Sequence, residues 1–182
     1  MRRGELLALR WQDVNFAGAT VRVERTVEKT VKLGYRFKSP KTKHGRRIIS
    51  LPPTAVVDLR EHRKQQLELR MALGMGKPDP DALVFCRHDG GNLVPSSVTR
   101  SWHQAVKGRW KFHALRHTHA SALIADGLDP VLIASRLGHS SPMVTMQVYA
   151  HLFRKRKIDT TAADAIEKLL GANRVPKPGS GH

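Results

Sequence analysis

The chain has 182 residues, of which 32 are Lys or Arg and 15 are Asp or Glu, so its formal net charge at pH 7 is +17. Hydrophobic residues make up 40% of the chain, which excludes a disordered basic tail, and no apolar run approaches the roughly 20 residues of a membrane-spanning helix. The single cysteine, Cys86, excludes an internal disulfide and a multi-thiolate metal site. We therefore expect a soluble, cytoplasmic protein that binds a polyanion such as nucleic acid.

The N-terminal quarter is predicted to contain a short helix and a small antiparallel sheet. Residues 2–11 place leucines and a tryptophan at helical spacing, which favours an amphipathic helix. Residues 20–27 alternate apolar and polar side chains, as a half-buried strand does, and 46–51 is a second strand candidate. The basic segment 38–45 between them is predicted to be a turn that directs its lysines outward.

The rest of the chain is predicted to be mainly helical. Pro52 and Pro53 precede a run of charged residues with spaced apolar positions, which is typical of a surface helix. Asp129 and Pro130 form a helix start signal, and Gly138 forms a stop signal. We expect helices over residues 55–73, 97–107, 113–125, 130–137, 142–149 and 161–170, a short buried strand over 83–86, and an unfolded tail over 173–182.

One predicted helix carries a cluster of basic side chains. His113, Arg116 and His117 are spaced i, i+3 and i+4, so they share one helix face. A fixed cation beside two groups that titrate near neutrality suits phosphate binding and proton transfer. A solvated polar face is the simpler interpretation. A zinc site is disfavoured because the motif lacks the intervening glutamate, Arg116 repels a cation, and no Cys or Asp ligand is nearby.

A candidate nucleophile follows in the next two helices. His139 comes after Leu137 and Gly138, and Tyr149 lies ten residues beyond it. The chain has two tyrosines, and the other, Tyr35, has no His and Arg motif around it. A free phenol has a pKa of about 10, so only ~0.1% is ionised at neutral pH. A tyrosine nucleophile therefore needs a base or strong cationic stabilisation, which the residues near Tyr149 offer.

These motifs together resemble the catalytic domain of the tyrosine recombinases, the phage-type integrases, over residues 2–153. Residues 2–11 resemble the first arginine motif of that family, and 113–117 match its His-x-x-Arg motif. Residues 137–139 match the third motif. The order of these motifs, with the tyrosine ten residues after the last histidine, makes the resemblance specific.

The resemblance implies a fold class and a domain layout. It implies a mainly helical α+β fold, the DNA breaking-rejoining catalytic fold with a small antiparallel sheet, over residues 1–172, followed by a flexible tail over 173–182. The family normally carries a further helical part of the catalytic domain and a core-binding domain before the first arginine, which is Arg2 here. We therefore expect this chain to lack both parts and to be impaired in activity.

The resemblance also implies site-specific recombination of double-stranded DNA. Tyr149 would attack a phosphodiester and form a 3′-phosphotyrosyl bond with release of a 5′-hydroxyl, which then attacks a partner strand. Arg2 and Arg116 would hold the non-bridging oxygens, where charge develops. Lys41, in the hairpin loop, would protonate the leaving oxygen, and Lys43 is its alternative. No cofactor and no metal ion is expected.

Four further residues complete the implied site. His113 would be the base for the tyrosine hydroxyl, and His139 would donate a hydrogen bond to the phosphate. Glu5 and His117 would orient their neighbours. The family acts as a homotetramer on DNA, so the full-length protein is expected to do the same.

Two other functions fit parts of the sequence. Residues 130–145 have the helix, glycine turn and second helix of a helix-turn-helix DNA-binding protein, although this interpretation leaves the His113 motif unexplained. A type IB topoisomerase shares the nucleophile and the cations. The segment 161–170 is expected to pack on the core of its own chain or on a neighbouring subunit, and the sequence leaves both possibilities open.

Overall fold

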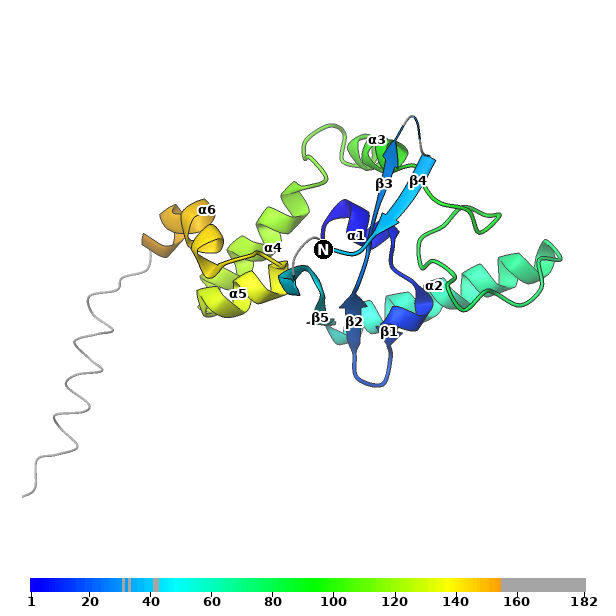
Figure 1. The fold of residues 1–182 in the computed structure, drawn as a ribbon, viewed down its shortest axis with the longest axis horizontal. Coiled ribbons are helices and arrows are strands. Elements are labelled where there is room, and N and C mark those ends of the chain that lie inside the picture. Colours follow the sequence, from blue (N-terminus) through cyan, green and yellow to red (C-terminus); the bar gives the residue numbers. More distant parts are fainter. Residues whose placement is uncertain (31, 33, 41–42, 155–182) are drawn as a thin grey trace, which may run out of the picture.

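The computed structural model describes residues 1–30, 32, 34–40 and 43–154. Figure 1 shows helices α4, α5 and α6 gathered on one side of the strands, with α2 on the other side and α3 beside the end of the β3–β4 hairpin. The first residue lies between the strands and the α4–α6 group. The predicted segments 161–170 and 173–182 lie outside the described residues. In the part of the chain that the structure describes, no helix is both long and apolar enough to cross a membrane.

The strands form two small antiparallel sheets instead of the single one predicted. One has the order β1-β2-β5, and the other is the β3–β4 hairpin. The predicted strand over 20–27 was wrong as one element, because the chain changes sheets at Glu24 and Arg25, whose side chains join a polar network. The first elements are α1 (Arg3–Leu7), a 3-10 turn η1 (Trp11–Asp13), β1 (Val14–Asn15), β2 (Thr20–Val23), β3 (Thr26–Thr30), β4 (Gly34–Lys38), η2 (Lys43–Gly45) and β5 (Arg47–Ser50).

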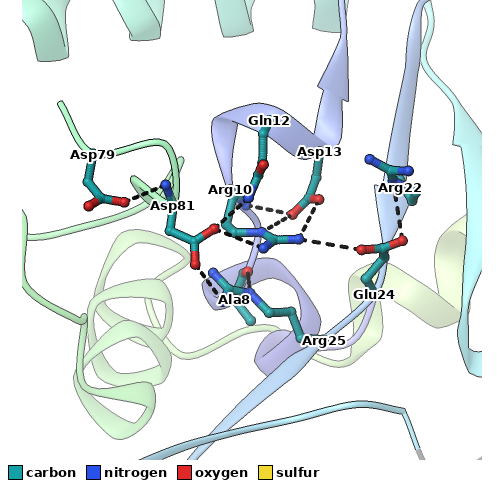
Figure 2. A network of polar contacts seen from close by, with 9 residues as sticks. All are labelled: Ala8, Arg10, Gln12, Asp13, Arg22, Glu24, Arg25, Asp79 and Asp81. Carbon is teal, nitrogen blue, oxygen red and sulfur yellow. Dashed lines mark hydrogen bonds and ion pairs between the residues drawn. The ribbon is translucent and has the colours of Figure 1, made fainter.

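That polar network is shown in Figure 2. Arg10 donates to both carboxylate oxygens of Asp13, at 2.9 Å each, and also pairs with Asp81 and Glu24. Arg25 lies against Asp81 from the start of the hairpin. The hydrogen bonds that Arg10 donates to Asp13 and Asp81 raise the pKa of Arg10, so its charge is fixed. The network joins η1, the junction of the two sheets and the loop that follows α2.

A long exposed helix and an extended loop follow the sheets. Helix α2 (Pro53–Ala72) has no buried residue, which confirms the predicted surface helix. The predicted strand over 83–86 was wrong. Leu83 and Cys86 form only isolated bridges, with Arg10 and Asn92, because the chain after Arg10 turns into η1 and offers no longer partner. Helix α3 (Pro95–Ala105) ends two residues before the predicted boundary.

The first hydrophobic core lies under the three-stranded sheet. Burial alternates along β2 and β5, so one face of each strand points inward. The buried side chains come from the segment after α1, from η1, from the sheet and from the loop after α2. They are Leu9, Trp11, Val14, Val21, Val23, Ile49 and Val84.

The second core joins the last three described helices, α4 (Ala114–Ala125), α5 (Pro130–Leu137) and α6 (Pro142–Arg154). Helix α5 has the predicted boundaries. Asp129 caps its first backbone N–H groups, and Gly138 ends it in the left-handed conformation with φ 69°. Helix α6 continues beyond its predicted end, with a kink at Tyr149. The buried members of this core are Ala120, Ile124, Ile133, Leu137 and Tyr149.

Candidate active site

The C-terminal end of α5 is the point where predicted site residues from distant parts of the chain meet. Three guanidinium groups, from the residue before α1, from β5 and from α4, donate to three successive backbone carbonyls there. Helix ends leave such carbonyls without partners and carry a partial negative charge, so cations are favoured. The pairs are Arg47 Nε to Arg136 O at 2.8 Å, Arg116 Nη2 to Leu137 O at 2.7 Å, and Arg2 Nη2 to Gly138 O at 3.1 Å.

A buried carboxylate holds two of these arginines together. Glu5 is 4% exposed and accepts from Arg47 Nη2 at 2.8 Å, from Arg2 Nη1 at 3.0 Å and from the Arg2 backbone N–H at 2.7 Å. Burial by itself raises the pKa of Glu5, but the bonds from Arg47 and Arg2 outweigh it, so the pKa is below its ordinary value. Glu5 is therefore ionised and pairs with both arginines.

Arg47 is a central residue of the site that the sequence analysis missed. Its side chain is 5% exposed, and besides Glu5 and the end of α5 it donates to the carbonyl of Gly45 at 3.1 Å. A signal was present, because Arg47 lies two residues before Ile49 in a strand with alternating burial, so it occupies an inward position. A charged residue at an inward position requires a buried partner.

Arg116 has a buried donor without a hydrogen-bond partner among the described residues. The residue is 8% exposed, and its Nη1 is buried without a hydrogen-bond partner in the described structure. Burial, followed by the charge of Arg2, lowers the pKa of Arg116 to about 10, so the group is still charged at pH 7. An unsatisfied buried cation is costly and favours an anion beside it. The geometry is therefore that of a site for a phosphate or a similar oxyanion.

Tyr149 lies at the kink of α6, and its hydroxyl group is within hydrogen-bond distance of a histidine. The residue is 4% exposed, and its Oη lies 2.9 Å from Nδ1 of His117. Burial raises the pKa of Tyr149, and the charge of Arg116 opposes that rise. We predicted His113 as the base for this hydroxyl. The structure instead places His113 against the ring of His117, with 5.0 Å between ring centroids, because His117 lies one helical turn further along α4.

His139 follows the end of α5 and is fixed from α6. Its Nδ1 lies 2.8 Å from Oγ1 of Thr145, a residue that is fully buried. Burial, and then the charges of Arg116, Arg2 and Arg47, lowers the pKa of His139 to about 4. The imidazole is therefore neutral at pH 7. In the tautomer in which the Thr145 hydroxyl donates to Nδ1, the proton of the neutral ring is on Nε2, which can donate to an oxygen.

The remaining predicted residues are not all placed. Lys41 lies outside the described residues, and of Lys43 the structure describes only the backbone, at the start of η2. Tyr35, the alternative nucleophile, donates its hydroxyl to the carbonyl of Asn92. Among the described residues, no group of three or more His, Cys, Asp or Glu side chains is arranged to hold a metal ion.

The comparison with protein families identifies the class. Residues 1–156 match the phage integrase family, and the chain belongs to that family. The predicted recognition and the recombinase catalytic fold are thereby confirmed, and the functional alternatives, a helix-turn-helix protein and a topoisomerase, gain no support.

Several relatives extend the likeness over nearly the whole chain. It is 29% identical to a tyrosine recombinase XerC-like protein of Caldanaerobacter subterraneus, over 93% of this chain and 46% of the relative. It is 31% identical to a putative prophage phiRv2 integrase of Mycobacterium tuberculosis, over 93% of this chain and 43% of the relative. The chain thus spans less than half the length of these curated relatives.

Solved structures agree in fold. The Tn1549 transposon integrase in complex with transposon right end DNA has a TM-score of 0.66 and 20% identity, over 94% of this chain and 55% of that one. The XerA recombinase has a TM-score of 0.59 and 22% identity, over 96% and 54%.

Proposed function

We propose that this chain is the catalytic part of an integrase that cuts and rejoins double-stranded DNA at specific sites through a covalent bond to Tyr149. The observation that carries the proposal is the buried Nη1 of Arg116, which has no hydrogen-bond partner among the described residues and belongs to a cation whose charge opposes the rise in the pKa of Tyr149. A phosphate oxygen on that donor places phosphorus between a fixed cation and a nucleophile. Membership of the phage integrase family supports the same reaction.

In the proposed first step, the oxygen of Tyr149 forms a bond to phosphorus while the bond from phosphorus to the 5′ oxygen breaks. His117 accepts the phenolic proton, since it is the histidine on the hydroxyl. Arg2 and Arg116 stabilise the charge on the non-bridging oxygens. Lys41 supplies a proton to the leaving 5′ oxygen.

The two other histidines act on the phosphate in this proposal. His139 donates a hydrogen bond from its free ring nitrogen, which the bond to Thr145 orients. His113 lies beside His117 and contacts the phosphate from the start of α4. Rejoining reverses the step with a 5′-hydroxyl of a partner strand. One phosphodiester replaces another of similar energy, so the exchange needs no external energy source.

Double-stranded DNA is the proposed partner. The net charge of +17 favours a polyanion, and the related Tn1549 integrase was solved with DNA. We further propose that the full-length protein acts as a homotetramer, because exchange of two duplexes requires four strand cleavages.

The proposal is tested with duplex oligonucleotides that carry a nick, which traps the covalent intermediate by letting the short cleaved fragment diffuse away. A library with randomised sequence around the nick removes the need to know the target site. The wild-type chain should form an adduct that resists detergent, and the trapped DNA should reveal a preferred sequence. Tyr149→Phe should form none, whereas Tyr35→Phe, the matched control, should react like wild type. An adduct that persists in Tyr149→Phe, or no adduct with the wild type, would overturn the proposal.

A further inference from the structure

A hollow of about 410 Å³ lies next to the candidate site and contains an exposed tryptophan. It is bordered by α1, by α3 and by the loop that connects α3 to α4. Its walls include the rings of Trp102, Trp110 and Phe112. His113, one of the predicted site residues, also lines it. The hollow is therefore contiguous with the group of residues around Tyr149.

The backbone of the loop holds Trp110 in place. Gly108 N donates to the carbonyl of His103 at 2.7 Å, and Trp102 Nε1 donates to the carbonyl of Trp110 at 3.0 Å. Lys107 and Gly108 have φ angles of 49° and 73°, which turn the loop back onto the end of α3. The backbone position of Trp110 is thus set by hydrogen bonds.

The ring itself has no partner in the described part of the chain. It is 62% exposed, and none of the ring or cation contacts among the described residues includes it. Trp102 and Phe112, in contrast, pack edge to face with centroids 5.7 Å apart, and they line the same hollow. A large aromatic side chain that stays exposed on a backbone held by hydrogen bonds is typical of a binding surface.

The charges around the hollow indicate the chemistry of its ligand. Arg3, His103 and Lys111 line it, and none of the described residues that line it is acidic. Aromatic rings interleaved with cations are the usual means by which proteins bind unpaired nucleotides, with the base on the ring and the backbone on the cations. The volume falls in the range of small-ligand pockets.

We propose that this hollow binds one unpaired base of the DNA substrate, stacked on Trp110 next to the phosphate that Tyr149 attacks. The placement beside that phosphate rests on the proposed function, because His113 is the residue shared by the hollow and the site. Cleavage breaks the strand there, and a nucleotide at a break loses a stacking neighbour and leaves the duplex at lower cost.

The experiment compares two duplexes of the same sequence that carry the fluorescent base 2-aminopurine. In one the base is paired in a blunt duplex, and in the other it lies in a three-nucleotide single-stranded overhang. Binding is measured by fluorescence anisotropy, and stacking by quenching of the 2-aminopurine emission. The variants are Trp110→Ala, Trp110→Phe and, as a matched control from the same loop, Arg109→Ala.

The wild type should bind the overhang duplex about tenfold more tightly than the blunt duplex and quench its emission. Trp110→Ala should lose both the preference and the quenching while its affinity for the blunt duplex stays within about twofold. Trp110→Phe should keep most of the preference for the overhang duplex. Arg109→Ala should weaken binding to both duplexes equally.

Equal preference in Trp110→Ala and wild type would overturn this proposal and leave the cleavage chemistry intact. Failure of the wild type to bind either duplex would instead overturn the DNA-binding function on which it rests. A Trp110→Ala variant with altered self-association in sedimentation, but an unchanged preference, would assign the ring to a protein contact and would also overturn the proposal.

Discussion

Replacement of Arg47 by glutamine removes the cation around which the candidate site is assembled. Arg47 and Glu5 are 5% and 4% exposed, and the variant leaves the Glu5 carboxylate buried with Arg2 as its remaining charged partner. Gly45 and the end of α5 also lose a donor. Breaking a buried ion pair from one side costs about 3–5 kcal/mol, against about 5–15 kcal/mol for a whole domain. We expect Arg47→Gln to lower the free energy of unfolding by about 3 kcal/mol.

The assay is urea unfolding at pH 7 followed by circular dichroism, with Glu5→Gln and the double variant completing a cycle. The double variant should recover part of the loss, because it leaves no buried carboxylate without Arg47, and the coupling energy should be about 2 kcal/mol. The control is Arg22→Gln, which removes an ion pair to Glu24 at 3.4 Å in which the side chains are 55% and 38% exposed. Exposed ion pairs of that kind contribute about 0–1 kcal/mol to the free energy of unfolding.

Two results would refute this reasoning. One is a loss in Arg47→Gln no larger than that in Arg22→Gln, which would mean that the pair is not buried in solution. The other is a double variant whose loss equals the sum of the single losses, since additivity would show that Arg47 and Glu5 do not interact.

Three further predictions concern residues at the two ends of α5, Asp129, Gly138 and His139. His139 should titrate near pH 4 in histidine NMR. Because the unfolded chain binds this proton at a higher pH, the free energy of unfolding should be fully present at pH 7 and should fall as the pH drops from 6.5 toward 4. His139→Asn should weaken that pH dependence. Titration of His139 near pH 6.5 would contradict the burial of the ring. Gly138→Ala should lower the melting temperature more than Gly74→Ala. Both glycines have φ above +60°, but of the two only Gly138 has a group, Arg47 Nη1 at 2.7 Å, in the way of an added Cβ. Equal shifts in melting temperature would contradict this close approach of Arg47 to Gly138. Asp129→Ala should lower the free energy of unfolding in urea by about 1 kcal/mol, because two backbone N–H groups lose their acceptor. Asp129→Asn should keep most of the wild-type stability. No loss in Asp129→Ala would contradict the capping role of Asp129.

The sequence alone determined the features that depend on neighbours within one or two helical turns. The start of α5 at Asp129 and Pro130 and its end at Gly138 were predictable, because capping and a left-handed glycine involve residues at most four positions apart. The i, i+3, i+4 spacing of the α4 motif likewise predicted a shared face. The order of these motifs was sufficient to predict the family.

Only the tertiary structure decided how these local elements meet. That His117 and not His113 lies on Tyr149 follows from the packing of α4 on α6, across 32 residues of sequence. Arg47 reaches the end of α5 across 89 residues. The division of 20–27 between two sheets depends on which remote strands are available as partners, β5 for one half and β4 for the other. Such contacts are set by the packing of whole helices and strands, about which a local pattern carries no information.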